Sequence, residues 1–205
     1  PIDGDTPATS RLGYSRAKLE AEGRLGQIAK EADMSFASVR LPHVYGARDL
    51  IFQQIRRGSV IQPGRGDNLY AHLHVEDAAR LMIRIAETGW SGISAVGDDH
   101  PASWREFYAV VREHYPALRV IWMPRWMALA GTSLLSLVAR SRSRPLLYTP
   151  DAVRGANLCL PVRPGLLWES VGLRPKYASI WDGIPVALDE CVAFRWSHPL
   201  DDRSR

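Results

Sequence analysis

The sequence has little cysteine and no long hydrophobic run. Its 205 residues include two cysteines, Cys159 and Cys191, which are too few and too far apart for a disulfide framework or a zinc-binding spacing. We therefore expect reduced thiols and a cytoplasmic protein. No signal-peptide pattern and no stretch of 18 apolar residues is present, so the sequence predicts no membrane-spanning helix.

The sequence also lacks clustered charge. Its 26 basic and 22 acidic residues give a net charge of +4, but the arginines are scattered and form no run of five. A basic stripe for nucleic acid is therefore not indicated, and we expect no nucleic-acid partner. Hydrophobic residues make up 46% and charged residues 23%, which are values typical of a globular protein with a sizeable core.

The sequence begins at Pro1 without an initiator methionine, in a polar stretch that favours a loop. We therefore expect it to be the C-terminal portion of a longer protein, in one large domain or two small ones.

Alternating helices and strands are predicted in the first half by hydrophobic periodicity. Pro42 should end a strand because proline has no N–H for the ladder, and residues 43–46 are then expected as a loop at the carboxyl end of that strand. Ligands bind at this end in open α/β sheets. The expected elements are a loop over 1–12, helices over 12–32, 49–57 and 76–88, strands over 35–41, 60–61, 70–75 and 92–97, and a turn over 64–68.

More helix is predicted in the second half. Ser103 and Glu106 have the spacing of a capping box, and Gly172 is placed to end a helix. The expected elements are helices over 103–114, 124–140, 164–171 and 179–194, a strand over 119–122, a helix turn over 150–156, and a disordered polar tail over 197–205.

The predicted helix over 124–140 contains fourteen mostly apolar residues, 126–139, followed by Arg140, Arg142 and Arg144. Such a stretch is too short to span a bilayer. We favour a cover packed over a substrate pocket. The alternative is a helix that docks on a membrane surface.

Two further patterns favour structural interpretations. His72 and His74 would lie on the same face of a strand, but no third ligand is close in sequence, so we expect structural histidines and no metal. The two glycines of the turn, Gly64 and Gly66, favour backbone freedom over phosphate binding, because no helix begins directly after them.

Tyr14 and Lys18 are the candidate catalytic residues. They lie four positions apart in the first predicted helix and so share one face. A nearby ammonium favours the phenolate form of a tyrosine, and such a phenol can exchange a proton with a hydroxyl or carbonyl group. Lysine is rare in this chain, with Lys18, Lys30 and Lys176 alone among 26 basic residues.

Four segments together resemble a known family. They are residues 14–18 followed by Glu22, residues 40–46, the glycine turn 64–66 with residues 74–79, and residues 171–177. In this order and spacing they resemble the extended short-chain dehydrogenase/reductases, the NAD-dependent epimerase/dehydratase group, over about residues 1–195.

The resemblance implies an α/β fold. It would hold the C-terminal part of a Rossmann-type parallel sheet and a smaller, mainly helical substrate-binding domain. The remnant of the NAD(P)-binding domain would comprise 1–46 and 70–97, the substrate-binding domain 47–69 and 98–196, and the tail 197–205.

The resemblance also implies roles for five residues. Tyr14 would be the acid/base and would also contact the cofactor, and Lys18 would orient it and hold the nicotinamide ribose. Pro42, His43 and Val44 would lie along the nicotinamide of NAD or NADP. The complete protein would then be an NAD(P)-dependent oxidoreductase, epimerase or dehydratase that acts on a small molecule. A homodimer would be possible.

The sequence departs from the family pattern in two respects. The glycine-rich phosphate turn, the residue that selects NAD or NADP, and the upstream catalytic serine or threonine are absent; Thr6, Thr9 and Ser10 lie in a loop and are not stand-ins. Sugar-nucleotide epimerases of the family often have an arginine where this chain has Tyr70. A less polar substrate is therefore favoured, as in the hydroxysteroid dehydrogenase and dihydroflavonol reductase branches, with Arg65 as a partial replacement.

The alternative is a non-catalytic relative that senses NAD(P) or binds a partner. An upstream segment with an intact glycine turn and a serine or threonine favours the enzyme, whereas loss of these residues favours the binding protein.

We predict that the 205-residue chain by itself is poorly soluble, inactive and unable to bind NADH detectably. Dinucleotide binding needs a glycine turn at a helix N-terminus, and unpaired strand edges favour aggregation. Restoring an upstream segment should recover solubility and binding. The measurement is an NADH titration followed by fluorescence; saturable micromolar binding by the isolated chain would contradict the prediction.

Overall fold

A computed structural model of the chain describes residues 1–3, 6–8, 12–141 and 149–193. The predicted polar tail, and Thr9, Ser10, Arg142 and Arg144, lie outside these residues. Cys159 and Cys191 are free thiols, exposed and buried respectively.

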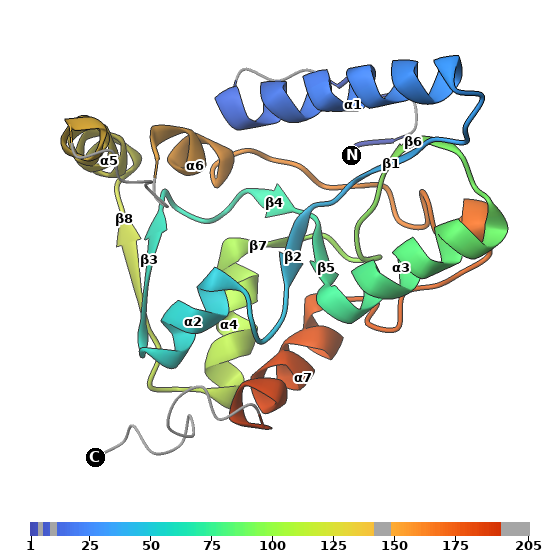
Figure 1. The fold of residues 1–205 in the computed structure, drawn as a ribbon. Coiled ribbons are helices and arrows are strands. Elements are labelled where there is room, and N and C mark those ends of the chain that lie inside the picture. The colour runs from blue at the N-terminus through green and yellow to red at the C-terminus, as the bar shows by residue number, and fades with distance from the viewer. Residues whose placement is uncertain (4–5, 9–11, 142–148, 194–205) are drawn as a thin grey trace.

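Parallel strand pairs form the centre of the first half, as expected for an α/β fold. Strand β1 (Ala37–Arg40) pairs with β6 (Gly92–Ala95), and β2 (His43–Tyr45) pairs with β5 (His72–His74). In Figure 1 these strands lie between helix α1 (Gly13–Glu31) and helix α3 (Val75–Thr88). The Glu22 carboxylate on α1 accepts hydrogen bonds from Ser38 and Arg40 on β1, so an ion pair joins helix to strand.

The expected loop over 43–46 was wrong, because His43–Tyr45 is the strand β2. Pro42 ends the pairing of the chain with β6, as a residue without an N–H must. The backbone remains extended beyond it and takes β5 as a new partner. A single-sequence pattern does not reveal this exchange of partners, since β5 lies about thirty residues further along the chain.

The rest of the structure consists of short strands and the remaining helices. The predicted strand over 70–75 is divided, because Tyr70 pairs with Ala102 while His72 pairs with His43. Strand β3 is parallel to β8, and β4 is antiparallel to β7. The elements are α2 (Leu50–Arg56), β3 (Ser59–Pro63), β4 (Leu69–Tyr70), β7 (Ala102–Ser103), α4 (Trp104–His114), β8 (Arg119–Met123), α5 (Arg125–Ser141), α6 (Pro150–Gly155), η1 (Glu169–Val171) and α7 (Ile180–Ala193).

The predicted helix over 164–171 was also wrong, since the segment is turns that end in the short 3-10 helix η1. Its consecutive side chains Leu166, Leu167 and Trp168 are all buried, which a helix with one inner face does not allow. The indole N–H of Trp168 donates to the carbonyl of Gly97 at 2.8 Å.

The predicted capping box is confirmed, and Gly172 ends a shorter element, the 3-10 helix η1, than the predicted helix. The Ser103 hydroxyl accepts a hydrogen bond from the Glu106 backbone N–H, and the Glu106 carboxylate accepts one from the Ser103 backbone N–H, which completes the capping box of α4. Gly172 has a left-handed backbone with φ of 63° at the end of η1. Both features depend on neighbouring residues alone, so sequence predicts them well.

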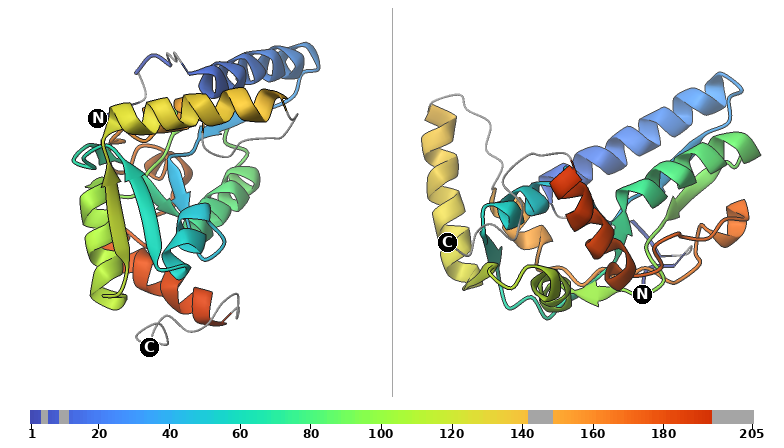
Figure 2. Two further views of the ribbon diagram at one scale, coloured as in Figure 1. Left: turned by 90° about the vertical axis from the view of Figure 1, so that its left-hand side faces the viewer. Right: turned by 90° about the horizontal axis from the view of Figure 1, so that it is seen from below.

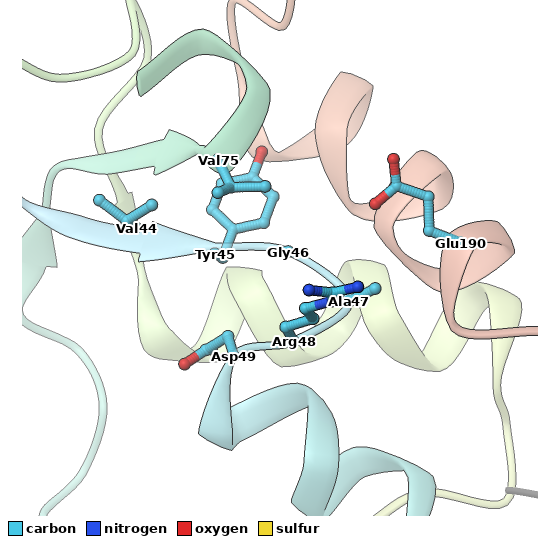
Figure 3. A pocket seen from close by; sticks show the side chains of 8 residues that line it. All are labelled: Val44, Tyr45, Gly46, Ala47, Arg48, Asp49, Val75 and Glu190. Carbon is cyan, nitrogen blue, oxygen red and sulfur yellow. The ribbon is translucent and has the colours of Figure 1, made fainter. Parts of the chain in front are cut away.

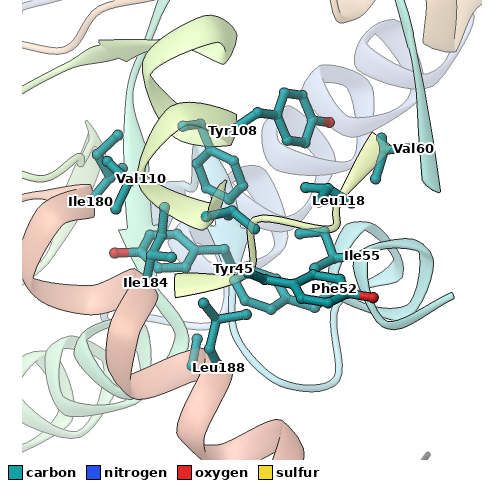
Figure 4. Packing of buried hydrophobic residues seen from close by; sticks show 14 of the residues in the cluster. Tyr45, Phe52, Ile55, Val60, Tyr108, Val110, Leu118, Ile180, Ile184 and Leu188 are labelled. Carbon is teal, nitrogen blue, oxygen red and sulfur yellow. The ribbon is translucent and has the colours of Figure 1, made fainter. Parts of the chain in front are cut away.

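The main hydrophobic cluster lies where α2, α4 and α7 meet, with the Tyr45 ring at its centre (Figure 4). Tyr45 and Ile184 are almost completely buried there. The backbone of Gly183 in α7 passes so close to Tyr45 that a Cβ at this glycine would lie 2.0 Å from the tyrosine hydroxyl oxygen. The absent side chain is therefore what allows α7 to pack against β2.

A buried carboxylate joins α3 to the last third of the chain. Asp77 is fully buried, and its two oxygens accept hydrogen bonds from the backbone N–H groups of Lys176 and Tyr177 at 2.8 Å each. Arg80 forms an ion pair with the same carboxylate at 2.5 Å. The start of α3 is therefore fixed to a segment about a hundred residues away.

Helix α5 does not bury its large apolar side chains among the described residues. Trp126, Leu134 and Leu137 are all more than 60% exposed, so the structure does not show these residues packed over a pocket. In the part of the chain that the structure describes, no helix is both long and apolar enough to cross a membrane.

The close approach of α7 to Tyr45 predicts opposite effects for two glycine substitutions in helices. Gly183→Ala in the full-length protein should lower the free energy of unfolding by about 1–3 kcal/mol, the usual cost of overpacking. Gly131→Ala in α5, where a Cβ meets no atom within 4 Å, should raise it by about 0.5–1 kcal/mol. Urea denaturation measures both, and stabilisation by Gly183→Ala would contradict the described packing.

Candidate functional site

Tyr14 and Lys18 lie on one face of the first turns of α1, as predicted. The Lys18 ammonium nitrogen is 5.6 Å from the centre of the Tyr14 ring, and the Tyr14 side chain is 72% exposed. Both groups are therefore accessible to a ligand, and the phenol has a cation beside it.

The start of α1 is fixed by a residue far away in sequence. Leu12 occupies the N-cap position and has no side-chain oxygen to cap the helix. The Asp151 carboxylate of α6 accepts a hydrogen bond from the Gly13 N–H at 2.9 Å instead. This hydrogen bond is the main reason that the pKa of the Asp151 carboxyl is lowered. Asp151 therefore sets the position of the turn that carries Tyr14.

Pro42, His43 and Val44 lie at the change of partner between β1 and β2, and all three are partly buried. Val44 also lines an open cavity of about 380 Å³ beyond β2 (Figure 3). Glu190 of α7 faces the loop after β2 across this cavity. The lining residues are Val44, Tyr45, Gly46, Ala47, Arg48, Asp49, Val75 and Glu190.

The structure thus divides the predicted site residues into two groups. Tyr14 and Lys18 contact each other on α1, whereas Pro42 precedes β2 and His43 and Val44 lie on it. Among the described residues, Val44 is the one predicted site residue that lines the cavity. The structure by itself does not join the two groups around a common pocket.

A chain of hydrogen bonds passes through His43. Its Nδ1 is 3.1 Å from Nδ1 of His72, and its Nε2 is 3.3 Å from an Asp49 carboxylate oxygen. His72 is completely buried, and its Nε2 lies 3.2 Å from the carbonyl oxygen of Ala102. Burial, and secondly the neighbouring His43, hold the pKa of His72 well below its usual range, so this ring is neutral.

The order of donors in this chain follows from the carbonyl group at its end. A carbonyl accepts, so Nε2 of His72 carries the single proton of a neutral ring, and its Nδ1 must accept from Nδ1–H of His43. Nε2 of His43 then faces the Asp49 carboxylate.

The Asp49 side chain contacts His43 and does not cap helix α2. It occupies the N-cap position of α2, where aspartate normally accepts a backbone hydrogen bond and contributes about 1 kcal/mol. Its side chain does not cap the helix in this structure. Asp49 instead joins the loop that lines the cavity to His43, so the sequence rule for a capping residue is broken at the candidate site.

The sequence did not identify three polar residues of the site. They are Asp49, His72 and Asp98. Asp98 is buried beside His72, and one of its oxygens accepts from the His72 backbone N–H at 3.4 Å. Burial raises the pKa of this carboxyl to about 8. The second oxygen has no hydrogen-bond partner within the described part of the chain.

The two histidines of β5 have separate contacts. His74 accepts a hydrogen bond from the Glu76 N–H at the start of α3, whereas His72 contacts His43. No group of three or more metal-binding side chains is found in residues 1–3, 6–8, 12–141 and 149–193.

Tyr70, at the position where relatives often have an arginine, is partly buried among aromatic rings. Its ring centre lies 5.8 Å from that of Trp104 and 6.2 Å from that of His72. Arg65, which could have replaced the missing charge, is 91% exposed and lies 3.7 Å from the Asp67 carboxylate. The surroundings of Tyr70 are therefore aromatic and not cationic.

The turn predicted over residues 64–68, before Tyr70, is present in the structure. Gly64 and Gly66 have φ of 90° and 73°, and side chains of Asn157 and Trp122 occupy the space where their Cβ atoms would lie.

The comparisons with known proteins agree with the resemblance inferred from the sequence. Residues 1–96 match the model of the NAD dependent epimerase/dehydratase family. UDP-glucose 4-epimerase from Thermus thermophilus, solved with NAD, is 20% identical with a TM-score of 0.68, and the match covers 93% of this chain and 57% of that chain. No curated protein matches the sequence significantly.

Two further solved structures are similar. The dTDP-glucose 4,6-dehydratase DesIV from Streptomyces venezuelae, with NAD bound, is 17% identical with a TM-score of 0.68, over 96% of this chain and 56% of that chain. RMD from Pseudomonas aeruginosa, complexed with NADPH, is 16% identical with a TM-score of 0.64, over 94% of this chain and 60% of that chain. The chain therefore spans somewhat more than half the length of these proteins. Its fold is that of Rossmann-type epimerases and dehydratases.

The burial of Asp98 predicts how stability depends on pH. Its carboxyl is neutral in the folded protein up to about pH 8 but ionises near pH 4 when unfolded. The unfolded state therefore binds fewer protons between these values. Stability should fall as pH rises from 4 to 8, by up to about 1.4 kcal/mol per pH unit from this group.

Asp98→Asn should remove this loss, so the stability advantage of the variant over wild type should grow from pH 5 to pH 8. Urea denaturation of the full-length protein at several pH values measures the difference. Asp33→Asn is the control, because Asp33 is exposed and its positive φ of 53° also suits asparagine. A constant difference between Asp98→Asn and wild type would rule out the titration.

Proposed function

With the match of residues 1–96 to the NAD dependent epimerase/dehydratase family as the premise, we propose that the complete protein is an NAD(P)-dependent oxidoreductase of this type. It transfers hydride at a carbon that bears a hydroxyl or carbonyl group. The observation that carries the proposal is the Tyr14–Lys18 pair, exposed at the start of α1 with the ammonium 5.6 Å from the ring. Tyr14 is the acid/base, and Lys18 places a cation beside it.

Two features of the described residues support binding of the nicotinamide end of the cofactor. Val44 offers an apolar surface at an open cavity, and Lys18 offers an exposed ammonium for the ribose hydroxyls. In the described part of the chain, the glycine turn after β3 does not lead into a helix N-terminus that could hold a pyrophosphate. These residues support a nicotinamide cofactor and leave NAD and NADP equally suitable.

Tyr14 has a defined task in this chemistry. The bound nicotinamide supplies or accepts the hydride. As hydride reaches a carbonyl carbon, the Tyr14 phenol donates its proton to the carbonyl oxygen; in the reverse direction, the phenolate removes the proton of the hydroxyl. Lys18 places a positive charge beside the ring, which offsets the negative charge that develops on the phenol oxygen as its proton leaves.

The substrate we propose is a small molecule less polar than a sugar nucleotide. The support is the aromatic environment of Tyr70, formed with Trp104 and His72, where a guanidinium would otherwise bind a diphosphate. Arg65 and Arg105 both pair with the Asp67 carboxylate, which reduces the positive charge that they offer to a phosphate.

The proposal predicts that Tyr14→Phe in the full-length protein lowers turnover by about 10²–10⁴-fold, the usual contribution of a positioned acid/base. NAD(P)H affinity should be unchanged, because the phenol hydroxyl is exposed and the ring remains. Steady-state kinetics with a suitable hydroxyl or carbonyl substrate and an NADH titration measure the two effects. Retention of most of the turnover would rule out this role for Tyr14.

A matched pair of lysine substitutions separates the role of Lys18 from a general effect of charge on α1. Lys18→Met should lower turnover and weaken NAD(P)H binding. Lys30→Met, near the far end of the same helix, should change neither. Equal effects of the two substitutions would contradict a specific role for Lys18.

A further inference from the structure

Helix α5 has the reverse of the usual distribution of side chains. Its inner face is small and polar: Ala128 and Thr132 are buried, and Ser136 is partly buried one turn further on. The hydroxyls of Thr132 and Ser136 donate to the carbonyls of Ala128 and Thr132, each at 2.7 Å, so they need no partner outside the helix.

The outer face of α5 carries the large apolar side chains. Trp126 is 71% exposed, Leu137 66% and Leu134 64%. Water disfavours such a continuous apolar surface, and surfaces of this kind usually bind a partner or a membrane. The exposed apolar residues are Trp126, Met127, Leu134, Leu135, Leu137 and Val138, and together they define the α5 outer face.

A second apolar surface lies beside α5. The left panel of Figure 2 shows α5 lying across the end of β3 and β8, on the same side of the molecule. Ile61 and Ile121 are direct neighbours across these two strands, and each is about half exposed. The apolar area is therefore formed by a helix and a strand pair that leads directly into it.

The charges on α5 and along the strand pair of β3 and β8 favour an anionic surface. Residues 125–141 contain no acidic residue, and Arg125 precedes the exposed Trp126. Arg57 and Arg119 are exposed at the other end of the strand pair. Tryptophan beside arginine at the edge of an apolar face is typical of helices that lie in the boundary between lipid headgroups and acyl chains.

A second copy of this chain fits the same surface less well. Two α5 helices packed face to face would bring their arginines together, with no acidic residue on either helix to pair with them. The anionic headgroups of a bilayer supply the missing countercharge.

We propose that α5 docks on the surface of an anionic lipid bilayer, with Trp126, Leu134 and Leu137 inserted at the headgroup boundary. The 17-residue helix lies along the surface and does not span the membrane. This binding is separate from the proposed hydride transfer, because it uses none of the residues assigned to that reaction.

Sedimentation of the full-length protein with lipid vesicles tests the proposal. The protein should pellet with vesicles of phosphatidylcholine and phosphatidylglycerol at low salt, and less with phosphatidylcholine alone or at high salt. Leu134→Gln with Leu137→Gln should reduce the bound fraction by at least about ten-fold. These two leucines would enter the bilayer, and apolar side chains that do so dominate the binding of a short helix.

The matched control is Ile28→Gln with Ile83→Gln. These isoleucines are 58% and 60% exposed on α1 and α3, away from the α5 outer face. The control variant should bind vesicles like wild type, and circular dichroism shows whether both variants are folded. Arg119→Gln with Arg125→Gln should reduce the preference for anionic vesicles by about five-fold per arginine.

Three results would overturn the proposal. The first is no pelleting with anionic vesicles at low salt. The second is an equal loss of binding in the α5 variant and the control variant. The third is a concentration-dependent dimer in analytical ultracentrifugation that the α5 variant alone abolishes, because a second copy would then cover the α5 outer face.

Discussion

The buried carboxylate of Asp77 is the constraint on which the geometry of β5 and of the His43–His72 contact depends. A charge without solvent must be fully hydrogen-bonded, and removing one partner of such a group typically costs about 3–5 kcal/mol. Asp77 obtains its donors from Lys176, Tyr177 and Arg80. Because Asp77 lies three residues after the end of β5, these bonds also fix β5. His72, and the ring of His43 that contacts it, are positioned as a consequence.

Each polar group in this region determines the state of the next. The Ala102 carbonyl fixes the tautomer of His72, which makes His43 a donor and directs its second nitrogen at Asp49. Helix α2 lacks the side-chain cap that Asp49 could provide, and this loss is the cost of the arrangement. A substitution at any member of the chain therefore changes the hydrogen bonds of its neighbours, as expected for a buried polar network.

Sequence predicted the features that depend on near neighbours. The shared face of Tyr14 and Lys18 follows from helical periodicity, and the capping box of Ser103 follows from a spacing of three. It did not predict β2, the division of the strand at Ala71, or the turns over 164–171, because distant segments decide these structures. His72 and Asp49 were missed for the same reason, since their contacts with His43 exist only after β2 and β5 have paired.

Residues 1–96 match the family, yet much of their geometry is set by residues beyond them. Asp151 holds the start of α1 beneath Tyr14, and Gly183 leaves the space in which Tyr45 sits at the end of β2. The Tyr14–Lys18 pair and the residues of β2 are thus positioned by contacts from the same C-terminal half that carries α5. Changes in that half can therefore move the start of α1 and the end of β2 while the matching residues stay the same. In a fold that serves many reactions, this is how one chemistry is fitted to different substrates.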